Sequence, residues 1–274
     1  MPDRIESKEL FGKPPRVLPE QFQFVRYRID GPVARLTLHR PEHNLLNEAM
    51  LLELADGVGA LTEKSSVKLI VIDADGKVFS GGVDIGEYTA ERAFSMIDAF
   101  HAACIAMVEA PQPVLVVVDG PAIGGGAELI AYGDLVIATP RARFALPEIT
   151  IGVFPPLAST MFPHIIGPKR ALELVLTGEA ISAERALELG LVNRLVSEAQ
   201  LPTAVNELIA KITAQSGAVL GMAKKAVIAG MGVSLREALR NSMSIFLNEL
   251  YRLEDSQEGL RALIEKRKPE WKNR

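Results

Sequence analysis

Ten residues, Asp119-Gly120-Pro121-Ala122-Ile123-Gly124-Gly125-Gly126-Ala127-Glu128, decide the fold and the site that we expect. They follow Val114–Val118, five aliphatic residues in a row, which is typical of a strand buried on both faces. Three glycines therefore leave a buried strand and open a helix. The free N–H groups and the positive dipole end of such a helix favour a phosphate or a developing oxyanion. The alternative is a strained turn in which Glu128 serves only the helix dipole.

The segments before this stretch alternate between strand and helix patterns, which predicts an α/β fold with helix-covered sheets. Asn47 is a plausible N-cap for the first helix, and Gly31-Pro32 is a turn pair between the first two strands. We expect strands at 22–30, 33–39, 69–73, 114–118 and 135–138, and helices at 47–61 and 91–109.

From Gly167 onward the pattern is helical. Gly178 and Gly190 follow two of the expected helices, where glycine favours helix termination. We divide the chain into an N-terminal extension (1–21), an α/β core (22–200) and a C-terminal helical region (201–274), with a boundary near Gly167 as the alternative. The helices expected here cover 168–176, 183–189, 201–215, 221–229 and 234–268.

Composition excludes several classes of protein. The chain has 274 residues, of which 48% are hydrophobic and 23% charged, as in an ordinary globular protein. Its formal net charge of −4 makes it a poor non-specific binder of nucleic acid. A single cysteine, Cys104, excludes an intrachain disulfide and a cysteine-based zinc site, and the four histidines are scattered, so we expect no metal.

No targeting pattern or membrane-spanning run is evident. Residues 1–21 are polar and contain acids, unlike a signal peptide or a mitochondrial transit peptide. No apolar run approaches the roughly 18 residues that a membrane helix needs. We therefore expect a soluble cytoplasmic protein.

Two further segments could carry chemistry. Phe79-Ser80-Gly81-Gly82-Val83-Asp84-Ile85 has paired glycines, which let a ligand or another segment approach closely. Ala145-Leu146-Pro147-Glu148-Ile149 places an acid among apolar neighbours, and Gly152-Val153-Phe154-Pro155-Pro156 follows it. Desolvation would raise the pKa of Glu148 and suit it to general acid catalysis; a satisfied, half-buried carboxyl is the alternative. Glu148 is 20 residues from Glu128, so only the fold could unite them.

These three segments, in this order and spacing, resemble the crotonase superfamily of acyl-CoA enzymes. The resemblance runs from about residue 22 to the C-terminus and includes Arg40-Pro41, 44–47 and 258–268. It implies a spiral of ββα units followed by a helical trimerisation region. It also implies an acyl-CoA thioester substrate, a homotrimer or a dimer of trimers, and no cofactor apart from the coenzyme A of the substrate.

The resemblance assigns roles to four residues. The backbone N–H groups of Val83 and Gly125 would form an oxyanion hole for the thioester oxygen. Glu128 would activate water as a base, and Glu148 would deliver the proton. Both acid/base positions of the hydratases are thus retained, which favours addition of water to a double bond conjugated to the thioester.

The resemblance also implies the substrate-binding residues. Val83, Asp84, Ile85 and Gly86 would line the acyl-CoA channel. Leu263 and Lys266 match positions that reach a coenzyme A site, often a neighbouring subunit's. Phe154, Pro155 and Pro156 stand where hydratases of linear chains usually have glycines. Pro156 has no N–H to offer the water, and the prolines should make the acyl pocket stiffer.

The stretch from Gly152 to Ser159 and the C-terminal sequence look most like the cyclic dienoyl-CoA hydratases of anaerobic aromatic degradation. Those enzymes add water to cyclohexa-1,5-diene-1-carbonyl-CoA in a 1,4 sense and give 6-hydroxycyclohex-1-ene-1-carbonyl-CoA. A linear enoyl-CoA hydratase of β-oxidation and an enoyl-CoA isomerase are alternatives. An RNA-binding relative is a remote alternative, because the basic clusters Lys224-Lys225 and 266–268 are better explained as solvated faces or as partners of the coenzyme A phosphates.

Overall fold

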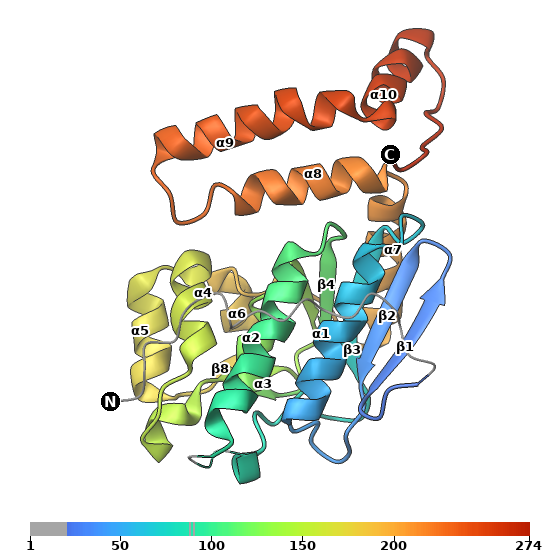
Figure 1. Ribbon diagram of the computed structural model, residues 1–274. Helices are drawn as coiled ribbons and strands as arrows, with labels where there is room; N and C mark the ends of the chain where they lie inside the picture. Colours follow the sequence, from blue (N-terminus) through green and yellow to red (C-terminus); the bar gives the residue numbers. More distant parts are fainter. Residues whose placement is uncertain (1–20, 88, 90) are drawn as a thin grey trace.

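A six-stranded sheet lies at the centre of the chain (Figure 1). The computed structural model describes residues 21–87, 89 and 91–274, so the predicted extension 1–21 lies outside it except for Gln21. The strand order is β1-β2-β3-β4-β6-β9, and all neighbours are parallel except in the β1–β2 hairpin. The strands are β1 (Val25–Asp30), β2 (Val33–Leu38), β3 (Leu69–Ala74), β4 (Val114–Val118), β6 (Leu135–Ala138) and β9 (Arg194–Leu195).

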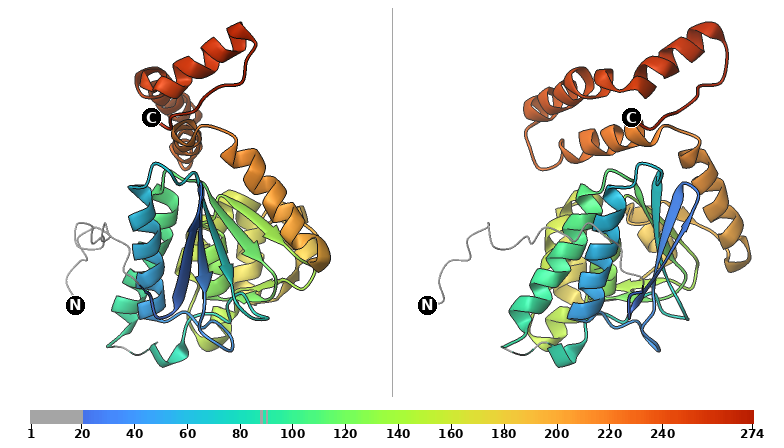
Figure 2. Two further views of the ribbon diagram at one scale, coloured as in Figure 1. Left: turned by 90° about the vertical axis from the view of Figure 1, so that its right-hand side faces the viewer. Right: turned by 45° about the vertical axis from the view of Figure 1, so that its right-hand side comes forward.

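Helices cover both faces of this sheet, as predicted. α1 (Glu48–Thr62) and α2 (Ala93–Glu109) lie on one face and α7 (Leu201–Thr213) lies on the other (Figure 2). Alternate strand residues supply the two cores: Ile70 and Val116 belong to the larger one, whereas Leu69 and Leu115 belong to the one that includes α7 residues. The prediction of a buried, helix-covered sheet is therefore confirmed. The Asn47 side chain caps α1 by accepting from the N–H of Met50, also as predicted.

A second, smaller sheet was missed by the sequence analysis. It consists of β5 (Ala122–Ile123), β7 (Arg143–Ala145) and β8 (Ile181–Ser182) in the order β5-β7-β8. Strands of two or three residues are too short to show a hydrophobic period. The pairing of Ile123 with Ala145 is what brings the glycine run beside the segment that contains Glu148.

Short helices between and after the strands complete the core. They are η1 (Ile85–Glu87), α3 (Gly125–Ile130), η2 (Pro147–Ile151), α4 (Pro156–Ile166), α5 (Pro168–Thr177), α6 (Ala183–Leu189) and η3 (Glu198–Gln200). α4 and α5 pack against each other at one end of the core (Figure 1).

The last helices form an arm that stands off the core (Figure 1). They are α8 (Gly217–Ile228), α9 (Leu235–Asn248), η4 (Leu250–Arg252) and α10 (Glu254–Glu265). The Lys224 ammonium ties α8 to the core, lying 2.7 Å from Asp134 Oδ2 and donating to the Met107 carbonyl at 2.7 Å. The predicted region 201–274 thus contains one helix that covers the sheet and an arm that begins at Gly217.

Two of the C-terminal helix predictions were inaccurate. The prediction of a single helix at 234–268 is wrong. α9 ends at Asn248, and Leu253 is extended, with ψ 136, before α10 begins. α8 begins at Gly217, four residues before the predicted start, because the Ser216 side chain accepts from the N–H of Val219. Among the described residues, no helix has the length and apolar character to cross a membrane.

Candidate active site

Two glycine-containing segments lie side by side at the ends of β3 and β4. The N–H of Ile123 donates to the Ser80 carbonyl at 2.9 Å, and Ser80 and Ala122 form a parallel bridge. A Cβ on Gly82, whose φ is 104, would lie 3.1 Å from the Ile123 carbonyl oxygen. Only glycine combines this positive φ with so close an approach of the two backbones.

The two predicted oxyanion-hole residues meet at this junction. Gly125 is the first residue of α3, and a Cβ placed on it would be 2.8 Å from the Val83 side chain. Within the described part of the chain, neither backbone N–H has a protein acceptor. Two neighbouring, unpaired amides are the donors that a thioester oxygen requires as it gains negative charge.

Glu128 lies in α3 and is only 2% exposed. Its Oε1 accepts hydrogen bonds from the N–H groups of Leu157 and Ala158, each at 2.8 Å. Those amides begin α4, where Pro155 and Pro156 have no N–H to offer. The Glu128 carboxyl therefore takes the place of a helix N-cap supplied from another element.

Glu148 lies in η2 and is 8% exposed. Its Oε1 is 2.7 Å from the position that a Cβ on Gly124 would occupy, so the carboxyl sits against the residue before the oxyanion-hole glycine. Its Oε2 is buried, and no partner for it exists among the described residues. This carboxyl thus has an oxygen free for a substrate proton.

Burial shifts the titration of both carboxyls in the same direction. It raises the pKa of Glu128 to about 8; the amides of Ala158 and Leu157 oppose this shift, and the charge of Glu148 adds to it. Burial also raises the pKa of Glu148. Because the charge of Glu148 raises the pKa of Glu128, a negative charge on one carboxyl favours the protonated form of the other.

A cavity of about 150 Å³ opens at this junction. Two of the predicted channel residues, Val83 and Ile85, line it together with Glu148. The other lining residues are Gly81, Gly82, Ile123, Gly124, Pro147, Thr150 and Ile151. Sequence reasoning missed Thr150 and Ile151, although they follow Glu148 within the same short helix.

The other two predicted channel residues have structural contacts. Asp84 Oδ2 accepts from the Arg40 guanidinium at 2.7 Å, and this hydrogen bond lowers the pKa of the Asp84 carboxyl. Asp84 Oδ1 accepts from the N–H of Gly86 at 3.1 Å. Arg40 also donates to the Leu45 carbonyl, so this ion pair joins the loop after β2 to the loop that carries Val83.

The remaining predicted binding residues lie outside the cavity lining. Phe154 is 61% exposed and immediately precedes the prolines that begin α4. Leu263 is 74% exposed on α10, and Lys266 ends that helix in a left-handed conformation. α10 lies in the arm, away from α3 (Figure 1). Their predicted role in a neighbouring subunit's coenzyme A site stays a prediction.

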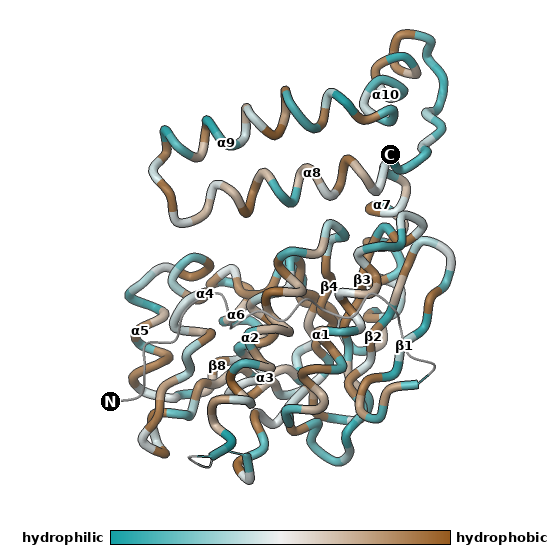
Figure 3. The backbone as a smooth tube through the Cα atoms, viewed as in Figure 1, coloured by the Kyte–Doolittle hydropathy of each residue, from teal (hydrophilic) through white to brown (hydrophobic). Residues whose placement is uncertain are grey.

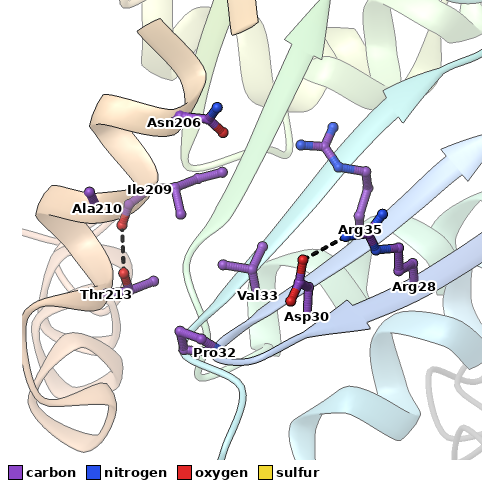
Figure 4. Close-up of a pocket in the computed structure, with 9 residues that line it drawn as sticks. All are labelled: Arg28, Asp30, Pro32, Val33, Arg35, Asn206, Ile209, Ala210 and Thr213. Carbon is purple, nitrogen blue, oxygen red and sulfur yellow. Dashed lines mark hydrogen bonds and ion pairs between the residues drawn. The ribbon is translucent and has the colours of Figure 1, made fainter. Parts of the chain in front are cut away.

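A larger groove, of about 550 Å³, lies between the β1–β2 hairpin and α7 (Figure 4). It shares no lining residue with the cavity beside Glu148. Arg28 forms an ion pair with Asp30, with 2.6 Å between Nη2 and Oδ2, and Arg35 forms one with Asp73. The charges of both arginines are therefore neutralised. The groove contains no residue predicted to be catalytic. Among the described residues, no group of three or more His, Cys, Asp or Glu side chains is placed to hold a metal ion.

Comparison with known proteins gives consistent matches. The family model described as enoyl-CoA hydratase/isomerase matches residues 28–274. A cyclohexa-1,5-dienecarbonyl-CoA hydratase of Thauera aromatica is 32% identical over 247 residues, which are 89% of this chain and 95% of that protein. A probable enoyl-CoA hydratase of Bacillus subtilis (strain 168) is 33% identical over 250 residues, with 89% and 96% covered.

Solved structures agree with the sequence matches. An enoyl-CoA hydratase of Mycobacterium smegmatis superposes with a TM-score of 0.86 at 32% identity, covering 91% of this chain and 99% of that one. The fold and the family that the three sequence segments implied are thus confirmed. The chain is an enzyme that belongs to the enoyl-CoA hydratase/isomerase family, within the crotonase superfamily.

Proposed function

We propose that this enzyme adds water to a carbon–carbon double bond conjugated to an acyl-CoA thioester. The observation that carries the proposal is the meeting of four groups at one junction. Glu148 lies against Gly124, and Glu128 lies in the helix that Gly125 opens, close enough to Glu148 for their charges to interact; the amides of Val83 and Gly125 are unpaired among the described residues. Hydration needs a base, an acid and a site for an enolate oxygen, and this junction supplies all three.

The geometry supports a division of roles. The Val83 and Gly125 amides would hold the thioester oxygen while negative charge develops on it. The ionised Glu128 would take a proton from water as its oxygen attacks the β carbon. The protonated Glu148 would give a proton to carbon as the enolate collapses. The added hydroxyl comes from the water, and the added proton comes from Glu148. The proton that Glu128 takes from the water balances it once the two carboxyls have exchanged protons with solvent, so the net reaction adds one water and requires neither a redox change nor a cofactor.

We propose a cyclic dienoyl-CoA as the substrate. The Phe154-Pro155-Pro156 sequence and the similarity to the Thauera aromatica enzyme support it. Water would add to the β carbon of cyclohexa-1,5-diene-1-carbonyl-CoA, and the proton would go to the far end of the diene. The product is 6-hydroxycyclohex-1-ene-1-carbonyl-CoA, as expected in anaerobic aromatic degradation.

A linear enoyl-CoA is the second candidate, favoured by the similarity to the Bacillus subtilis protein. Turnover should be measured on the cyclic dienoyl-CoA and on crotonyl-CoA in water labelled with ¹⁸O. A higher kcat/KM on the cyclic diene, with label in the product, supports the proposal. A preference for crotonyl-CoA would show that a linear enoyl-CoA is the substrate. A product without label would indicate an isomerase.

We also propose that the arm joins three copies of the chain, as a trimer or a pair of trimers. Leu235, Leu239, Met243 and Phe246 are exposed along one stripe of α9, three or four residues apart. Figure 3 shows apolar positions recurring along this helix, and the four side chains are at least half exposed, so the described part of the chain leaves them largely uncovered. Native mass spectrometry checks this: a monomer at micromolar concentration would refute it, and Leu239→Lys should disrupt the trimer.

A further inference from the structure

Tyr132 lies four residues after Glu128, one helical turn further along the same segment. It is 8% exposed, and its hydroxyl donates to the Leu157 carbonyl at 3.1 Å. Leu157 is the residue whose N–H donates to Glu128 Oε1. The backbone N–H of Leu157 therefore donates to Glu128, and the backbone carbonyl of Leu157 accepts from Tyr132. Two side chains of one segment thus bind the same residue of α4.

The first turn of α4 depends on these contacts. Pro155 and Pro156 contribute no N–H groups, and no side chain next to the helix caps it. The amides of Leu157 and Ala158 are thus the first donors of the helix, and both go to Glu128. A shift of this turn would move the two donors away from the carboxyl together.

We propose that Tyr132 is a positioning residue: its hydroxyl fixes the first turn of α4 so that the amides of Leu157 and Ala158 hold the Glu128 carboxyl in its working orientation. This inference rests on the proposed function of Glu128 as the base. The Tyr132 hydroxyl donates to the Leu157 carbonyl, so its influence on Glu128 passes through Leu157.

The charged and titratable groups around Glu128 determine the direction in which its pKa should change when Tyr132 is altered. Glu148 from η2, Cys104 from α2 and Tyr132 itself are the described titratable groups that face Glu128. Burial raises the pKa of Tyr132, so the phenol stays a neutral donor. The α4 amides favour the ionised form of Glu128. Loosening them should raise the pKa of Glu128.

The test is Tyr132→Phe, which removes one oxygen and keeps the ring in the core. We expect kcat to fall by about 3- to 10-fold, the change that the loss of one buried hydrogen bond predicts. KM should stay within about twofold, and the acid limb of the pH profile should move up by about half a unit or more. Loss of stability with an unmoved limb would overturn the inference.

A matched control is Gln112→Leu. Gln112 is also buried and donates from its side chain to a helix carbonyl, that of Leu61, at 3.0 Å. Neither Gln112 nor Leu61 belongs to the cavity lining or contacts Glu128 or Leu157 through a hydrogen bond among the described residues. This variant should lose stability and keep the wild-type pH limb; a limb that moves as it does in Tyr132→Phe would also overturn the inference.

A second readout does not depend on turnover. The protein can be labelled with ¹³C at glutamate carboxyls, and the Glu128 resonance assigned by comparison with Glu128→Gln. Its pKa should be higher in Tyr132→Phe than in the wild type. If the wild type hydrates no acyl-CoA, the proposed function fails while this titration still tests the link through α4. Equal pKa values in the two proteins would overturn the link itself.

Discussion

The two carboxyls that we propose as catalytic, Glu128 and Glu148, lie in contrasting surroundings although their charges interact. Glu128 has two amides from α4 on one oxygen. Glu148 rests against the bare backbone of Gly124, and its buried Oε2 has no partner in the described part of the chain. Amide donors favour a carboxylate. This difference supports the proposed roles of Glu128 as base and Glu148 as acid. Burial nevertheless outweighs the amide donors and raises the pKa of Glu128 to about 8, so the base form of Glu128 becomes abundant only as the pH approaches that value.

The largest expected effect comes from removing each carboxyl in turn. Glu128→Gln and Glu148→Gln should each lower kcat for hydration by about 10²–10⁴-fold, because each removes one proton-transfer group. The folded state should persist in both, as checked by circular dichroism. Turnover that is unchanged in both variants would refute the hydratase assignment.

A proton-exchange assay separates the two roles. Butyryl-CoA has no double bond to hydrate, so loss of its α-hydrogen to deuterated water reports only on the group that exchanges protons with carbon. We expect exchange to survive in Glu128→Gln and to be lost in Glu148→Gln. The reverse pattern would show that Glu128 is the acid and Glu148 the base.

Gly124→Ala should have the next largest effect. A Cβ there would lie 2.7 Å from Glu148 Oε1 and would displace the acid, so we expect kcat to fall by about 10²-fold, as for other displaced catalytic groups. Gly31→Ala is the matched control, because Gly31 has a similar φ (54 against 52) and open space around it. If both variants lose equal activity, backbone strain and not the position of Glu148 is responsible.

The pH dependence tests the raised pKa of Glu128. A base must be ionised, so kcat/KM should rise with pH on its acid side, with a midpoint near 8. Stability should change in the opposite direction. The folded chain keeps the Glu128 proton up to about pH 8, whereas the unfolded chain releases it near 4.5, so stability falls as pH rises between these values.

Glu128→Gln removes this titration and therefore supplies the comparison. Its Tm should exceed that of the wild type by roughly 2–8 °C at pH 9, and the gap should close near pH 5. Differential scanning calorimetry at both pH values measures it. A gap that is the same at both would show that burial does not control this carboxyl.

Pro156→Gly should have the smallest effect. It adds one N–H at the start of α4, where linear-chain relatives usually have glycine by the resemblance given above. We expect the ratio of crotonyl-CoA to cyclic dienoyl-CoA turnover to rise about 2- to 5-fold, the size of one added or lost neutral hydrogen bond. Thr160→Gly, on an exposed position of the same helix, controls for the added flexibility. An unchanged ratio would show that Pro156 does not contribute to substrate specificity.

Some of the site was predictable and some was not. Glycine runs and an acid among apolar residues leave local signals, which pointed to the segments that contain Glu128 and Glu148. The roles of Val83 and Gly125 followed only from the resemblance to the crotonase superfamily. Tyr132 and Gly124 were given no role, since a tyrosine beside apolar residues reads as core and one glycine among three carries no separate signal. Leu157 and Ala158 act through backbone amides, which no side-chain pattern reveals.

The sequence by itself determined the elements whose causes are local. The aliphatic run 114–118, the Asn47 cap and the Gly31-Pro32 turn each need only near neighbours, so their patterns predicted them correctly. The tertiary structure alone decided which elements meet. The two-residue pairing of β5 with β7 places Glu148 against Gly124, and the proline start of α4 leaves its first amides for Glu128. These contacts join residues 22 to 30 positions apart, and their free energy depends on packing that no local window contains.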